Sequence, residues 1–145
     1  MPGETSYFVV GPKQIVQSLV ASEFHYKTIQ AGEPIVAGDI VYQDGFIVRR
    51  AWGNALVTMD AVGLCPVAVA SGITTDVMIR CRISGYAFLS GLTSGGSLYV
   101  SATSAGKFTQ TPPSNSGDIV QFLGIALTGN SIEVNPRQGF QIIDT

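Results

Sequence analysis

Glycine residues interrupt the sequence at short intervals from about residue 35 onward, and the segments between them alternate apolar and polar side chains. Alternation with period two places successive side chains on opposite faces of an extended strand, so it predicts β-strands. The clearest strand spans 75–84, where the odd-numbered residues from Val77 to Ile83 are apolar. We expect these residues to be buried, while Met78 and the charged residues between them face solvent or a partner.

A tight hairpin is predicted at 41–48, with Asp44 and Gly45 as the central residues of a type I′ turn. Many short strands separated by turn residues are typical of all-β domains. The predicted fold is therefore all-β, a small antiparallel β-barrel or β-sandwich. Further strands are expected at 35–36, 61–69, 97–101, 107–110, 119–127 and 131–135.

Two parts of the sequence repeat the same order of a turn, a strand, a second turn and a strand with a central glycine. The first part is 38–67 and the second is 95–127. This pattern predicts a degenerate internal duplication, and two similar halves can pack into one closed sheet. We assign a β-barrel domain to 31–145 on this basis.

The first 30 residues lack the glycine rhythm of the rest of the chain. They carry a separate apolar stripe that includes Ile15 and Leu19, and this stripe fits either a short helix over 12–24 or an extended segment. We expect 1–30 to be an N-terminal arm. An apolar stripe with no place in the barrel needs a neighbour, so Ile15 and Leu19 are candidate contacts with a partner or a second subunit.

Composition excludes several classes of function. Charged residues make up only 12% of the 145 residues and the formal net charge is −2, so no basic field is present to attract nucleic acid. One His and two Cys are too few for a zinc site, and we expect no metal and no cofactor. Cys65 and Cys81 lie in apolar segments and are predicted to be buried thiols, with a disulfide as the alternative.

The sequence contains no apolar segment long enough to span a membrane and no signal-peptide pattern at its start. We therefore expect a protein made in the cytoplasm that does not bind a membrane. Catalysis by a nucleophile needs a base, and His25 is the single imidazole. No catalytic residue is assigned, and we expect the chain not to be an enzyme.

Four arginines and one tryptophan are the candidate partner contacts within the β-domain. Arg49 and Arg50 follow the hairpin, and Arg80 and Arg82 share the outward face of the strand at 75–84. Their planar guanidinium groups suit carboxylate-rich partner surfaces, although charge on an outer face also serves solubility and discourages stray sheet pairing. Trp52 lies in a predicted loop, where it is either an interface anchor or a cap over the barrel.

The C-terminal half contains a string of turn and strand residues formed by Gly91–Ser101, Ala105–Thr109 and Gly117–Leu127. This string is similar to a β-module of tailed-bacteriophage virion proteins. The upstream segment Ala31–Tyr42 is similar to the opening of the same module in capsid decoration, or cement, proteins. The resemblance covers about residues 28–136.

Membership of the decoration-protein family implies a small β-barrel that forms a homotrimer and binds the capsid exterior where shell subunits meet. The partner would be the major capsid protein, and the protein would stabilise the virion without catalytic residues. The N-terminal stretch 2–26 is longer than the module requires, which leaves room for a tail, neck or fibre component. A carbohydrate-binding β-module is the alternative from a different class, and it would need an exposed row of aromatic side chains.

Overall fold

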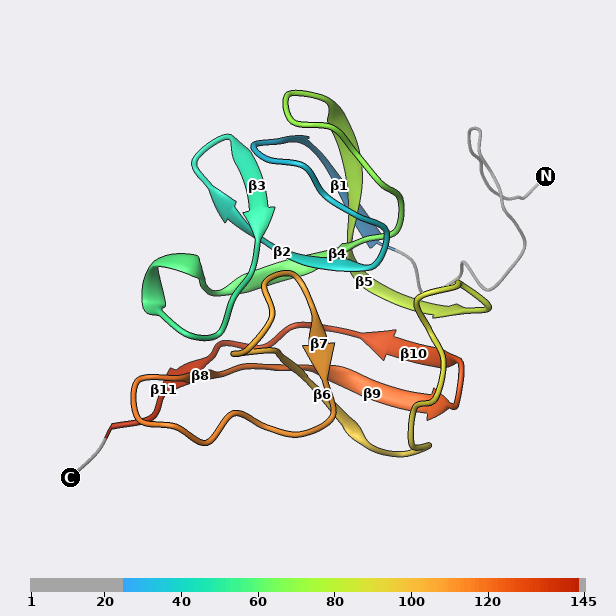
Figure 1. Cartoon of the computed structure of the whole chain (residues 1–145). Helices are drawn as coiled ribbons and strands as arrows, with labels where there is room; N and C mark the ends of the chain where they lie inside the picture. Colours follow the sequence, from blue (N-terminus) through green and yellow to red (C-terminus); the bar gives the residue numbers. More distant parts are fainter. Residues whose placement is uncertain (1–24, 144–145) are drawn as a thin grey trace.

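The computed structural model describes residues 25–143, and this part of the chain is all-β, as predicted. A closed five-stranded barrel is followed by a second set of strands that packs against it (Figure 1). A short 3-10 turn, Leu56–Thr58, lies in the loop between the third and fourth strands. The strands are β1 (His25–Ala31), β2 (Asp39–Asp44), β3 (Ile47–Arg50), β4 (Ala61–Cys65), β5 (Thr74–Ser84), β6 (Ser97–Val100), β7 (Phe108–Thr109), β8 (Ile119–Val120), β9 (Phe122–Thr128), β10 (Ser131–Val134) and β11 (Phe140–Gln141).

Strand β1 closes the barrel, whose order is β1-β3-β2-β4-β5. It pairs antiparallel with β5 along most of its length and parallel with the start of β3, where Ala31 faces Val48. Residues 25–30 are thus part of the barrel, which was expected from residue 31 onward, because β1 supplies both closing pairings and leaves no open edge. The predicted helix over 12–24 and the contact residues Ile15 and Leu19 lie outside the described residues.

The second set of strands repeats the neighbour order of the first. The order β3-β2-β4-β5 in the barrel matches the order β7-β6-β9-β10 in the second set, which we call the second sheet. Strand β5 pairs antiparallel with β10 where the two sets meet, so the hydrogen-bonded order is continuous over nine strands. Strands β2, β3 and β4 and their counterparts β6, β7 and β9 lie in the two parts of the sequence that repeat, whereas β5 and β10 follow them. This likeness in strand order supports the internal duplication, which itself stays a prediction.

Both sets also carry a register shift at the corresponding place. It lies between Val41 and Tyr42 opposite β4, and between Leu98 and Tyr99 opposite β9. Gly63 and Gly124 lie next to these shifts, and each approaches the following strand so closely that a Cβ atom would clash with a backbone oxygen, that of Met78 and that of Glu133 respectively. Glycine is required there because the two backbones leave no room for a Cβ atom.

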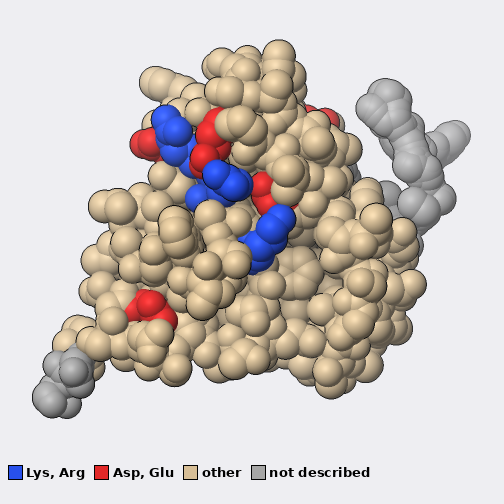
Figure 2. Space-filling model, viewed as in Figure 1, with Lys and Arg blue, Asp and Glu red and all other residues tan. Residues whose placement is uncertain are grey.

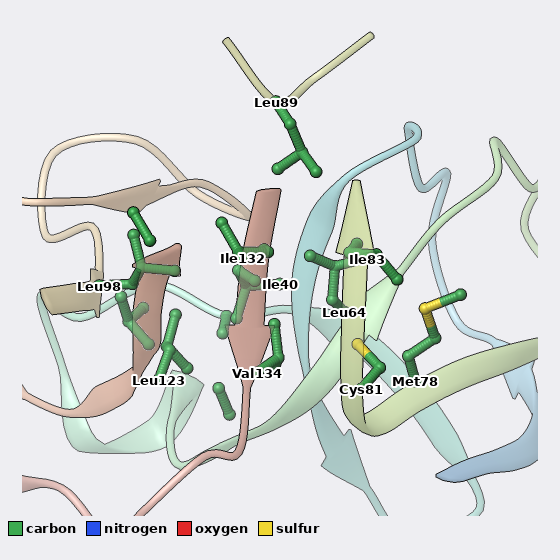
Figure 3. Packing of buried hydrophobic residues seen from close by; sticks show 14 residues of the cluster. Ile40, Leu64, Met78, Cys81, Ile83, Leu89, Leu98, Leu123, Ile132 and Val134 are labelled. Atoms are coloured by element: carbon green, nitrogen blue, oxygen red, sulfur yellow. The ribbon is translucent and has the colours of Figure 1, made fainter. Parts of the chain in front are cut away.

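The buried apolar side chains form two clusters. The first fills the barrel and consists of Ile29, Ala31, Ile35, Val41, Val48, Cys65, Val69 and Val77. The second, larger cluster lies between the outer face of the barrel and the second sheet, and Figure 3 shows it from close by. Its members are Ile40, Ala51, Ala61, Leu64, Met78, Cys81, Ile83, Leu89, Leu98, Val100, Leu123, Ala126, Ile132 and Val134.

Strand β5 contributes to both clusters, and this corrects the expected one-sided alternation. Val77 points into the barrel, whereas Met78 is buried in the second cluster and Ile79 is only half-buried. The pairing of β1 with β5 skips Ile79, because His25 lies opposite Arg80 and Tyr26 lies opposite Met78. This bulge shifts the inward face by one residue, so Met78 and Cys81 contribute to the same cluster.

Other expectations differ in detail from the structure. The hairpin turn lies at Gly45 and Phe46, since Asp44 pairs with Ile47, and Gly45 has the positive φ of 67°. The expected strand at 119–127 is divided into β8 and β9 at Gln121. The expected strand at 35–36 is a single bridge, between Ile35 and Val69.

The prediction of buried thiols is confirmed. Cys65 and Cys81 are both free and buried, one in each cluster. Burial raises the pKa of the Cys65 thiol, and it raises the pKa of the Cys81 thiol to about 12. A hydrogen bond between Cys65 Sγ and Thr75 Oγ1, 3.8 Å apart, lowers the first pKa by less than burial raises it.

Candidate interaction surfaces

One face of the barrel carries a row of paired charges, and most of the remaining surface in the same view is uncharged (Figure 2). Arg49 Nε lies 3.2 Å from Asp44 Oδ2, and Arg50 Nη2 lies 3.3 Å from Glu33 Oε1. These pairs are partly exposed, so each is worth on the order of 0–1 kcal/mol. The guanidinium groups of Arg49 and Arg50 therefore already have carboxylate partners. We define the charged strip as Glu33, Asp39, Asp44, Arg49, Arg50 and Lys107.

The remaining pair of the charged strip joins the second sheet to the barrel. Asp39 is fully buried at the start of β2, and its Oδ1 lies 3.0 Å from Lys107 Nζ. Its Oδ2 accepts the backbone N–H of Val36 at 2.9 Å. Lys107 belongs to the segment between β6 and β7, so this charge-assisted hydrogen bond crosses from one strand set to the other.

The other two predicted arginines lie on β5 and are separated from the charged strip by β1. Arg80 and Arg82 are both exposed. Arg82 Nη2 lies 3.8 Å from Glu133 Oε1 on β10, whereas Arg80 faces His25 across the β1–β5 pairing. The structure thus divides the four candidate arginines into two groups and does not gather them into one basic patch.

Trp52 connects two loops of the chain. Its indole Nε1 donates a hydrogen bond to Ala102 O at 3.0 Å, and its backbone N–H donates to Thr58 O at 3.2 Å. The side chain is half-buried. Trp52 therefore holds the loop after β3 against the loop after β6, and only part of its ring is available to a partner.

An exposed aromatic side chain that sequence reasoning missed lies at the tip of the β2–β3 turn. Phe46 is 94% exposed, the largest exposure among the large apolar residues of the described part of the chain. The only signal in the sequence was an aromatic residue directly after the turn glycine Gly45. An apolar ring at a loop tip gains buried area only from a second molecule, so Phe46 joins the candidate contacts.

The aromatic pairs of the described residues do not form the flat row that a carbohydrate-binding module would need, because the stacked rings of Tyr86 and Phe88 are partly buried against the second cluster. Tyr99 and Phe122 meet on the outer face of the second sheet, but their rings are 6.3 Å apart at an interplanar angle of 79°. The guanidinium of Arg137 lies 5.7 Å from the Phe122 ring centre. This edge-to-face pair with a cation above it offers no continuous stacking platform.

The described residues contain no group of three or more His, Cys, Asp or Glu side chains that could hold a metal ion. His25 is exposed at the start of β1, and within residues 25–143 no hydroxyl or thiol is hydrogen-bonded to its ring.

Comparisons with protein-family models and with curated proteins found no match for the chain. Within residues 25–143, no helix has the length and apolar character needed to cross a membrane.

Proposed function

We propose that the chain is a non-enzymatic structural protein of a tailed-phage virion, a decoration or cement protein that binds the outside of the capsid and bridges shell subunits. The observation that carries the proposal is that the residues covered by the resemblance agree with the residues covered by strands β1 to β10. The resemblance to the decoration-protein module covers about residues 28–136, and strands β1 to β10, which build both clusters, cover residues 25–134. The resemblance therefore covers nearly all the strands whose side chains form the two clusters.

The surface supports binding to a protein shell. Its charged strip is internally paired, and Phe46, which is 94% exposed, lies in a two-residue turn between β2 and β3. A charged fraction of 12% is low for a small domain that meets water on all sides, and assembly would bury part of that uncharged surface. The proposed partner is the major capsid protein, and the proposed form is a homotrimer on the capsid exterior.

The physical mechanism would be linkage. A protein that binds the assembled shell and not the loose subunits stabilises the shell by mass action, by about 2.7 kcal/mol per site when its free concentration is 100 times Kd. No reaction is needed for this effect. Shell stability should therefore rise with the concentration of the free protein until the sites are filled.

The test is co-sedimentation of the purified full chain with capsids of the phage that encodes it, prepared without the protein. Saturable binding and a higher disruption temperature of the decorated capsids are expected. An absence of co-sedimentation at micromolar concentration, or gold-labelled antibody that marks the tail and not the head, would overturn the capsid assignment. Light scattering that shows a monomer would overturn the proposed homotrimer.

A pair of variants tests the contact residue. Phe46→Ser should weaken capsid binding at least tenfold, because the ring is exposed in the free protein and is proposed to be buried in the complex. Val57→Ser is the matched control, since Val57 is 81% exposed in a different loop. If Phe46→Ser binds capsids as tightly as Val57→Ser does, Phe46 is not part of the interface.

A further inference from the structure

The tetrapeptide Gly-Asp-Ile-Val occurs twice, at 38–41 and at 117–120, and both copies have the same local structure. The glycine has a φ of 91° in the first copy and 92° in the second. In each copy the aspartate N–H donates to the carbonyl three residues earlier, at 3.1 Å to Val36 O and 3.0 Å to Asn115 O. The Oδ2 atom then accepts the N–H of the same earlier residue, at 2.9 Å and 3.2 Å respectively.

The two copies differ at the second carboxylate oxygen. Asp39 Oδ1 is paired with Lys107 Nζ at 3.0 Å. Asp118 Oδ1 has no hydrogen-bond or ion-pair partner within residues 25–143, although Asp118 is only 9% exposed. A buried carboxylate is unfavourable unless a cation or further donors compensate its charge. Asp118 therefore has the acceptor geometry of Asp39 without the cation.

Asp118 lines a cleft of about 230 Å³ between the loop after β6 and the loop after β7. The cleft is also lined by Thr111, Ser114 and Asn115, whose side chains make no hydrogen bond within the described part of the chain. Pro112 and Pro113 add apolar surface to its wall. The cleft thus combines one buried anionic oxygen, further side-chain oxygens and a short apolar wall.

We propose that this cleft receives the side chain of a lysine from a partner protein, with its ammonium group bound to Asp118 Oδ1. An ammonium carries one positive charge and three N–H donors, which match one carboxylate and neighbouring hydroxyl oxygens. The alkyl stem of lysine would lie along Pro112 and Pro113. The internal Asp39–Lys107 pair is the same interaction within one chain.

Size and charge argue against other occupants. The cleft is smaller than the roughly 300–1,000 Å³ of usual small-molecule sites, so it suits a single side chain. A calcium site takes six to eight oxygen ligands with several carboxylates, whereas Asp118 is the single acidic residue that lines this cleft. The assignment rests on the cleft within residues 101–118 and on the comparison with Asp39, and it does not depend on the partner being a capsid protein.

The experiment is an NMR titration of the ¹⁵N-labelled full chain with Nα-acetyl-lysine methylamide. Saturable shifts are expected at the backbone amides of Asn115 and its neighbours. The Nε-acetylated form of the same probe, which has no charge, should produce none. If both probes act equally, or if no shift saturates below 100 mM, the proposal is overturned.

Substitutions identify the group that binds the probe. Asp118→Asn keeps an oxygen for the Asn115 N–H and should weaken binding at least tenfold. Asp76→Asn is the matched control, because Asp76 is exposed and accepts a hydrogen bond from Thr28 Oγ1 elsewhere on the barrel. Unchanged binding by Asp118→Asn would overturn the proposal.

A calcium titration and a lysine substitution test for other cations in the cleft. Calcium chloride that shifts the same amides at lower concentration than the lysine probe would make the cleft a metal site and overturn the proposal. Lys13→Met in the full chain should leave the amide shifts around Asp118 unchanged. A change at those amides would mean that the protein's own lysine fills the cleft, which also overturns it.

Discussion

Replacement of Gln121 by Leu should destabilise the protein strongly, because the Gln121 side chain makes hydrogen bonds to backbone atoms of two other segments. Gln121 is 1% exposed. Its Oε1 accepts the N–H of Ala61 at 2.7 Å, and its Nε2 donates to Ala61 O at 2.9 Å and to Arg137 O at 2.6 Å. Gln121 thus joins the start of β4, the break between β8 and β9, and the segment after β10.

The size of the loss follows from the groups left without partners. Gln121→Leu would leave one N–H and two carbonyl oxygens unsatisfied near the second cluster, at a cost of roughly 1–3 kcal/mol each. The free energy of unfolding should therefore fall by at least about 3 kcal/mol, a large share of the roughly 5–15 kcal/mol typical of a domain. For a chain of this size that loss lowers Tm by roughly 10 °C.

Urea unfolding followed by circular dichroism measures this change, with Gln138→Leu as the matched control because Gln138 is exposed. Gln121→Glu tests whether hydrogen bonds or shape are responsible, since Glu has nearly the same shape but at neutral pH cannot donate to the two carbonyls. Both Gln121 variants should be destabilised and the control should not. A change within about 0.5 kcal/mol of wild type for Gln121→Leu would refute the reasoning.

Two further predictions concern the shared strand β5. Met78→Ala should lower the free energy of unfolding by about 2–5 kcal/mol, because it is a large-to-small change in a core. Ile79→Ala should lower it by less than half as much, because Ile79 is half-buried. Chemical denaturation measures both values, and a larger loss for Ile79→Ala than for Met78→Ala would contradict the bulge at Ile79. The pKa of the Cys81 thiol is raised to about 12, so the unfolded chain loses this proton first and stability should fall as pH rises above about 9. Between pH 8 and pH 10 the wild type should lose about 1 kcal/mol more than Cys81→Ala, and parallel pH profiles would argue against a buried thiol.

Sequence periodicity predicted most of the strands because one face of each is buried and the other is not. It missed β1 for the same reason: His25–Ala31 has only two buried residues, Ile29 and Ala31, so the strand has almost no apolar alternation to detect. Its place is set by pairing with β5 and β3, which are distant in sequence. Local pattern carries no information about such a closing strand.

The face of β5 could not be predicted either, because it depends on a bulge. A regular strand from Val77 to Ile83 would bury Ile79 and expose Met78. Pairing with β1 inserts one unmatched residue at Ile79, and the strand then serves two cores in succession. The irregularity arises from the partner strand and leaves no trace in the alternation itself.

The ion pairs of the candidate contacts could not be predicted, because the partners of charged residues are also non-local. Lys107 and Asp39 are 68 positions apart, and Arg50 and Glu33 are 17 apart. From the sequence, Arg49 and Arg50 were expected on an outer face that binds a carboxylate-rich partner or serves solubility, whereas folding provides each with a carboxylate of the same chain. The repeated Gly-Asp-Ile-Val segments were the one local signal of the Asp118 cleft, since both place an aspartate after a turn glycine.

The distribution of charge limits how this protein can bind a partner. The ion pairs of the charged strip satisfy its cations and anions within the chain, so the strip exerts a weaker field at a distance than single charges would. Long-range steering therefore contributes little to association, and affinity has to come from short-range apolar contact and hydrogen bonds. Phe46 offers the first kind of contact and the Asp118 cleft offers the second. Of the two, only the contact at Asp118 includes an unpaired charge, so the salt dependence of binding should arise mainly from that cleft.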